Sequence, residues 1–110
     1  ATWETTFEWN PLEHGVFINE TFFNQEIVSK RCNSNGFDWF HANSMDKTPD
    51  GNFLLSSRHT NTIYHISRET GNVIWRLGGK MSDFEFDEGA EFSHQHHIRY
   101  RGGDETHMLV

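Results

Sequence analysis

The stretch between residues 38 and 79 alternates short runs of aromatic and β-branched residues with clusters of turn-forming residues, and this alternation constrains the fold most strongly. Runs of this length with turns this close predict a four-stranded antiparallel meander. One such meander forms one blade of a β-propeller or one half of a small sandwich. The predicted strands are Asp38–Ser44, Phe53–Ser57, Thr62–Ser67 and Val73–Leu77.

The flanking segments carry weaker signals. Trp3, Phe7 and Trp9 alternate, which predicts a strand over Thr5–Trp9. The pattern of Pro11–Phe23 fits either a short strand or irregular wrapping. Further expectations are a short helix over Asn24–Lys30, an acidic loop over Lys80–Ala90, a strand over Phe92–Tyr100 with its core at His94–Tyr100, a turn over Arg101–Glu105, and the start of another strand over Thr106–Val110.

An internal repeat supports a propeller. A shift of about 55 residues without gaps superposes His41 on His96 and Leu54 on Leu109. A period near 50 residues is typical of propeller blades, and a closed propeller needs about four to eight of them. We therefore expect an all-β fold of antiparallel four-stranded blades. We also expect one partial propeller domain over residues 1–110, with a near-complete blade at about 38–79 and partial blades before and after it.

Composition and short motifs limit the classes of binding partner and the compartment that fit this chain. The formal net charge of −7 argues against a nucleic-acid surface, and no apolar run has the length of a membrane span. Cys32 is the only cysteine, so no intrachain disulfide is expected. Asn19-Glu20-Thr21 is an N-glycosylation sequon, which favours a secreted or extracellular protein. The chain lacks an initial Met and stops within an apolar run, so we expect a longer parent whose remaining blades are its partners.

Polar residues converge at one end of the predicted blade. Alternation puts His41 and Asn43 on one face of their strand, and a symmetric first hairpin pairs His41 with Arg58. The repeat puts His96 at the matching place one blade later. Two imidazoles, an amide and a guanidinium facing a central channel suit a tetrahedral oxyanion.

Other interpretations of these residues stay open. His41 and Arg58 also fit solvated strand and turn residues, and Asn43 fits a residue that satisfies a neighbouring backbone group. The His94, His96 and His97 cluster lacks a carboxylate or cysteine at zinc spacing. The run from Asp46 to Asn52 lacks the last ligand of a calcium loop, and Gly78-Gly79-Lys80 is not a phosphate loop. We therefore predict no metal and no cofactor.

Several blocks together resemble the arylsulfotransferase family in its fungal-type branch. They are FEWNPLEHG, HANS, LSSRHTNTIY, WRLGGK and the Gln95-His96 pair, and they cover nearly the whole chain. The resemblance implies a β-propeller that moves sulfate from an aryl sulfate ester to a phenol, without a nucleotide donor, through a sulfated histidine. It implies that His96 is the nucleophile and that His41, Asn43 and Arg58 bind the sulfate.

One residue differs from the pattern of the family, and because of it both His96 and His97 stay candidates for the nucleophile. His97 follows His96 where relatives carry a small or acidic residue, although strand face and repeat both favour His96. The predicted function is aryl sulfate transfer to a phenol by the full-length parent, with this chain alone inactive. The alternative is a non-catalytic propeller module that binds an anionic ligand or partner.

Overall fold

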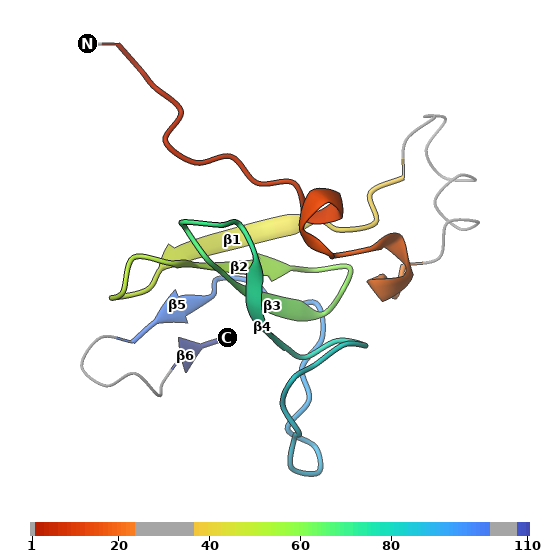
Figure 1. Ribbon diagram of the computed structural model, residues 1–110. Helices are drawn as coiled ribbons and strands as arrows, with labels where there is room; N and C mark the ends of the chain where they lie inside the picture. Colours follow the sequence, from red (N-terminus) through yellow and green to blue (C-terminus); the bar gives the residue numbers. More distant parts are fainter. Residues whose placement is uncertain (1, 24–36, 102–107) are drawn as a thin grey trace.

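A computed structural model describes residues 2–23, 37–101 and 108–110. Within these residues the chain is all-β apart from two short 3-10 turns, and no described helix is long and apolar enough to cross a membrane. Four antiparallel strands form one meander in the order β1-β2-β3-β4, and β5 pairs with β6 (Figure 1). The elements are η1 Pro11–His14, η2 Ile18–Glu20, β1 Ala42–Lys47, β2 Phe53–Ser57, β3 Thr62–Ile66, β4 Val73–Leu77, β5 Arg99–Tyr100 and β6 Met108–Leu109.

The predicted meander is confirmed. Strands β2 and β4 have the predicted bounds, and β3 ends one residue earlier than expected. Strand β1 differs, because it begins at Ala42 rather than Asp38 and runs on to Lys47. The backbone of His41 has a φ of 54°, in the left-handed region, so extended structure cannot begin before it.

The first hairpin pairs nearly as expected. Ser44 lies opposite Ser56, and Ala42 lies opposite Ser57, with an irregularity of one residue between the two pairs. This β-bulge shifts the register by one residue, so that the pairing on the His41 side of the bulge is the predicted one. There the Arg58 backbone N–H donates to the His41 carbonyl over 3.0 Å. His41 therefore lies at the end of the β1–β2 ladder, across from Arg58.

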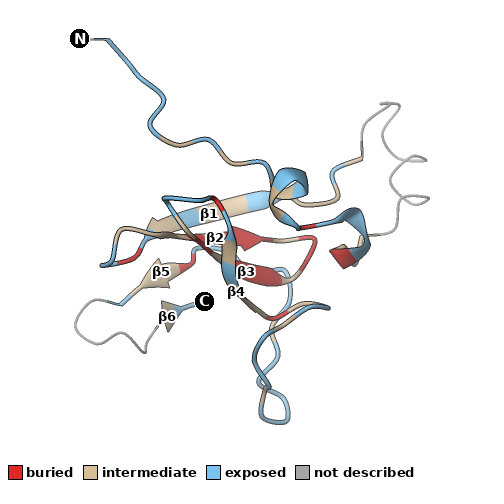
Figure 2. Ribbon diagram, viewed as in Figure 1, coloured by how far each residue is buried: buried red, intermediate tan, exposed pale blue. Residues whose placement is uncertain are grey.

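Both faces of the sheet are covered, each by a different part of the chain. One face holds Tyr64 and Ile66 and packs against the N-terminal segment through Val16, Phe7 and Trp9. The other holds Leu54 and Ile63 and packs against the segment that follows the blade. The partners on that second face include Phe92, Ile98, Tyr100 and Met108. Buried residues accordingly concentrate in β2 and β3 (Figure 2). The arrangement fits a propeller blade between its neighbours, and the described residues do not form a closed propeller.

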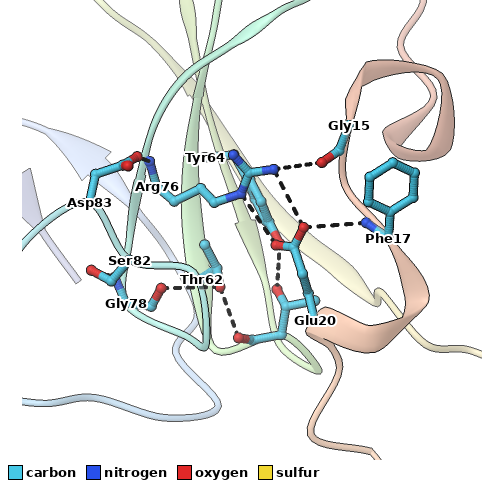
Figure 3. Close-up of polar contacts among 10 residues, drawn as sticks. Gly15, Phe17, Glu20, Thr62, Tyr64, Arg76, Gly78, Ser82 and Asp83 are labelled. Carbon is cyan, nitrogen blue, oxygen red and sulfur yellow. Dashed lines mark hydrogen bonds and ion pairs between the residues drawn. The ribbon is translucent and has the colours of Figure 1, made fainter.

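A buried carboxylate fixes the 3-10 turns to the sheet. Glu20 is 5% exposed, and its oxygens lie 3.2 Å from the Tyr64 hydroxyl and 3.3 Å from Arg76 Nε (Figure 3). Arg76 also donates to the Gly15 carbonyl over 2.8 Å. Burial raises the pKa of Tyr64 well above its ordinary value. The outer strands and the N-terminal wrapping therefore share one polar network.

Two predicted strands are wrong, and the Pro11–Phe23 segment takes the irregular form. Thr5–Trp9 forms no strand. Phe7 and Trp9 pack on the blade as side chains, Trp9 Nε1 donates to the Gly71 carbonyl over 2.8 Å, and Trp3 is 99% exposed. Of the strand expected over His94–Tyr100, only Arg99–Tyr100 pairs, because His94 and His97 have φ values of 55° and 65°. The expected helix over residues 24–30 lies outside the described residues, as does most of the turn over 101–105.

The second hairpin repeats the first at a slightly shorter period. Asp46 pairs with Leu54 in one hairpin, and Tyr100 pairs with Met108 in the other. Asp46 therefore corresponds to Tyr100 and Leu54 to Met108, each 54 residues later in the sequence. Side-chain acceptors on β1 bind the β5 segment along its length. Ser44 Oγ accepts from the Ile98 N–H over 2.9 Å, and Asp46 Oδ2 accepts from the Tyr100 N–H over 2.7 Å. Successive first strands thus run side by side in the same direction.

Candidate functional site

The segment Asp38–His41 enters the blade through a carboxylate clamp. Asp38 Oδ1 accepts from the backbone N–H of His41 over 3.0 Å, and Asp38 Oδ2 lies 2.5 Å from His41 Nδ1. Both side chains are well exposed, at 57% and 41%. The left-handed backbone at His41 is uncommon for a residue other than glycine, and the two hydrogen bonds to Asp38 stabilise it.

His59 packs against this segment and contacts its backbone. Its Nδ1 lies 2.6 Å from the Asp38 carbonyl, and its ring centroid is 4.6 Å from that of His41. The Phe23 ring stacks on the other side, with centroids 3.9 Å apart. His59 is only 7% exposed, and burial lowers its pKa despite the opposing effect of Asp38. A largely neutral, buried imidazole therefore carries the exposed Asp38–His41 pair.

The segment His94–His97 is held by a buried glutamine. Gln95 Nε2 lies 3.1 Å from the Ser57 carbonyl and 3.2 Å from the Thr62 carbonyl, at the ends of β2 and β3. The Gln95 carbonyl accepts from the Asn43 amide over 2.8 Å. The Gln95 side chain therefore ties this segment to the meander, at Ser57 and Thr62, which lie 38 and 33 residues earlier in the sequence.

The two histidines after Gln95 differ in their contacts. Both are exposed. His96 Nδ1 lies 2.8 Å from the His94 carbonyl. Because a carbonyl only accepts, this contact puts the hydrogen on Nδ1 and leaves the Nε2 lone pair free. The His97 ring makes no hydrogen bond to any residue in the described part of the chain.

The four predicted site residues are partly brought together. Arg58 lies across from His41, and Asn43 binds the backbone of Gln95, the residue before His96. Among the described residues, no hydrogen bond or ring contact joins His96 to His41, and the Arg58 guanidinium has no hydrogen bond or ion pair. The expected strand faces do not hold, because positive φ values at His41, His94 and His97 and the bulge at Asn43 interrupt the alternation. The assignments of His41, Asn43, Arg58 and His96 remain predictions.

Three supporting residues were not identified from the sequence. Asp38 lies three residues before His41, a spacing that allows a side chain to cap a following backbone N–H. His59 directly follows Arg58 in a block already singled out. Gln95 was treated only as a neighbour of His96, because no local pattern reveals that an amide will be buried against strands far away in the sequence.

The Asp38, His41 and His59 side chains also have the chemistry of a metal site. One potential ligand atom from each lies within 4.8 Å of the others. The Nδ1 atoms of both histidines already contact Asp38 oxygens, at 2.5 Å and 2.6 Å. Hydrogen bonding within the protein therefore accounts for the cluster without an ion.

A separate cavity lies at the other end of the blade. It has a volume of about 200 Å³, and its lining includes Asp50, His65, Trp75 and Tyr100. Neither ring nitrogen of His65 has a hydrogen-bond partner among the described residues, and burial lowers the pKa of this ring. None of the four predicted site residues lines this cavity.

A protein-family comparison identifies the framework that carries these side chains. The family model described as arylsulfotransferase (ASST) matches residues 1–110. The chain belongs to the arylsulfotransferase family. No curated protein and no solved structure matched it. For this arylsulfotransferase domain, membership supports a function of the aryl sulfotransferase type, with aryl sulfates and phenols as the substrate classes.

Proposed function

We propose that the full-length protein transfers sulfate from an aryl sulfate ester to a phenol through a sulfated His96. The observation that carries the proposal is the orientation of the His96 ring. Its Nδ1 is engaged by the His94 carbonyl, and its Nε2 keeps a lone pair on an exposed ring. A neutral imidazole nitrogen in this state is a competent nucleophile. Membership of the arylsulfotransferase family supports the choice of substrate.

The reaction has two displacements. His96 Nε2 attacks sulfur, the bond from sulfur to the aryl oxygen breaks, and its electron pair leaves with the phenolate. A second phenol then attacks the sulfur of the sulfated histidine, and the nitrogen–sulfur bond breaks to restore the ring. A shared covalent intermediate gives ping-pong kinetics.

Arg58 is the proposed sulfate clamp. Its guanidinium has no ion-pair partner in the described residues, and its planar fork matches two oxygens of a sulfate group. Asn43 uses one amide hydrogen to hold the Gln95 carbonyl, which leaves the other for a sulfate oxygen. Charge spreads over the sulfate oxygens in the transition state, so donors fixed in advance lower the barrier.

The alternative is a binding module in which Arg58 and the histidines hold an anion without turnover. Release of a coloured phenol from 4-nitrophenyl sulfate, measured with and without an added phenol acceptor, separates the two functions. The enzyme releases phenol faster when the acceptor is present. Absence of release under both conditions contradicts the proposal and favours the binding module.

Mass spectrometry tests the intermediate directly. The full-length protein is quenched after mixing with 4-nitrophenyl sulfate in the absence of acceptor. We expect a sulfate-sized mass increase on the peptide that contains Gln95–Arg99, and no increase when inorganic sulfate replaces the ester. An adduct on a different peptide in an active enzyme would overturn the role of His96.

A further inference from the structure

Asp38 determines which nitrogen of His41 carries the hydrogen. Its carboxylate has no donor when ionised, and its Oδ2 lies 2.5 Å from His41 Nδ1. The hydrogen of a neutral His41 is therefore on Nδ1, and the Nε2 lone pair is available on the far side of the ring. A neutral His41 of this kind accepts a hydrogen bond at Nε2, so it cannot donate one there to a sulfate oxygen.

We propose that Asp38 is a positioning residue that makes His41 Nε2 the proton acceptor for the incoming phenol. This inference rests on the proposed function, and it changes the role of His41 from holding sulfate to removing a proton. Histidine paired with a carboxylate at one nitrogen and acting as a base at the other is a recurring arrangement in group-transfer enzymes.

The clamp has the rigidity that this role needs. Asp38 holds both the backbone N–H and the ring of His41, which fixes the ring relative to its own backbone. The Asp38 backbone is itself held by His59, whose Nδ1 contacts the Asp38 carbonyl over 2.6 Å. Among the described residues, the charged and titratable groups around His41 are Asp38, His59 and the nearby Arg58.

The proton and electron pairs balance over the cycle. In the second displacement the phenol O–H proton moves to His41 Nε2 as the phenol oxygen forms its bond to sulfur. The nitrogen–sulfur bond breaks, and its electron pair returns to His96. His41 then gives its proton to water, while the phenolate released in the first displacement takes one from water.

The variant Asp38→Asn tests the inference. Its amide oxygen still accepts from the His41 backbone N–H, but its NH₂ group faces Nδ1, which moves the ring hydrogen to Nε2. In the full-length protein labelled with ¹⁵N-histidine, we expect the wild-type His41 signals of an Nδ1–H tautomer and the opposite tautomer in the variant. His41→Gln assigns the signals. A wild-type Nε2–H tautomer would overturn the inference without any measurement of activity.

Kinetics of the two displacements separate this inference from the proposed function. We expect Asp38→Asn to slow transfer from sulfated His96 to a phenol by roughly 10²–10³-fold, and sulfation of His96 by less than about threefold. Asp83→Asn is the matched control, because Asp83 also accepts a backbone N–H, from Arg76 over 2.7 Å, and should leave both rates unchanged. Absence of sulfation in the wild type contradicts the proposed function, whereas normal transfer by Asp38→Asn contradicts only the role of Asp38.

A metal would be a different explanation of the same cluster. The wild-type protein is treated with EDTA, dialysed, and assayed with and without stoichiometric ZnCl₂. Unchanged transfer after EDTA supports the hydrogen-bonded clamp. Loss of transfer with EDTA and its restoration by zinc would overturn the inference and assign Asp38, His41 and His59 as ligands.

Discussion

The segments Asp38–His41 and His94–His97 precede the first strands of successive hairpins, but they are held differently. The first is fixed by its own residues and by the end of β2, through Asp38 and through the hydrogen bond from the Arg58 N–H to the His41 carbonyl. The second is docked on the preceding blade by side chains of both, its own Gln95 and the Asn43 and Asn61 of that blade. Gln95 inserts among β2 and β3, and the Asn61 amide oxygen accepts from the His94 N–H over 3.0 Å.

The two segments therefore depend on different parts of the chain for their position. The first segment is held by hydrogen bonds within its own blade. The second is held by polar contacts with its neighbour, including those of its own Gln95, because its positive φ values prevent regular pairing. Changes in the first blade are therefore expected to alter the position of His96, the proposed nucleophile, even where they do not contact it.

The largest expected effect lies within the second segment. His96→Ala should lower phenol release by roughly a thousandfold or more, because it removes the proposed nucleophile, whereas His97→Ala should cost less than about tenfold. Initial rates with 4-nitrophenyl sulfate measure both. The two variants alter neighbouring exposed histidines, so each controls for the other. A full rate in His96→Ala together with a lost rate in His97→Ala would reassign the nucleophile.

The contribution of the first blade is tested next, at the residue across from His41. Arg58→Lys keeps the positive charge but loses the planar fork, so we expect a loss of roughly 10–100-fold in kcat/KM. Arg68→Lys, on the exposed turn between β3 and β4, is the matched control and should have no effect. Equal rates for Arg58→Lys and the wild type would show that Arg58 does not clamp the sulfate.

The docking of the second segment is tested by Gln95→Ala. The change leaves the Ser57 and Thr62 carbonyls without their buried donor, which should lower the free energy of unfolding by about 1–3 kcal/mol. It should also lower the rate, because His96 loses its anchor. Urea unfolding and phenol release measure the two effects. If stability falls while the rate is unchanged, His96 is positioned by other contacts.

The smallest expected effect is a pH dependence of stability that arises from His59 and His65. Burial lowers the pKa of both rings below the ordinary 6.5, so the unfolded chain binds more protons than the folded chain just below that value. The free energy of unfolding should therefore fall as pH decreases from about 7.5 to 5. This window lies above the range of Asp46, whose pKa is lowered by the Tyr100 N–H.

Urea titrations at several pH values measure this slope. His59→Gln and His65→Gln should each make it shallower, because the glutamine side chain does not titrate. Only the first change touches the support of Asp38–His41, so it alone should also reduce the rate of transfer. A slope that neither variant alters would show that the His59 and His65 rings are not its source.

Local chemistry determined the meander. The turns at residues 48–52, 58–61 and 68–71 and the short apolar runs between them predicted β2 and β4 to the residue, because alternation and turn formation depend on near neighbours in the sequence. The same patterns predicted that His41 lies across from Arg58, which a backbone hydrogen bond confirms. The family blocks predicted an arylsulfotransferase, and the match over residues 1–110 agrees.

Only the tertiary structure decided how the site segments are held. Three features leave no periodic signal in the sequence. They are the clamp of Asp38 on His41, the packing of His59 against that pair, and the burial of Gln95 against the ends of β2 and β3. Left-handed residues at His41, His94 and His97 broke the predicted alternation, because side-chain hydrogen bonds and packing outweighed local strand preference. The contacts of Gln95 with Ser57 and Thr62 join residues more than 30 positions apart. Such contacts depend on which surfaces meet after folding, and a single sequence does not specify those surfaces.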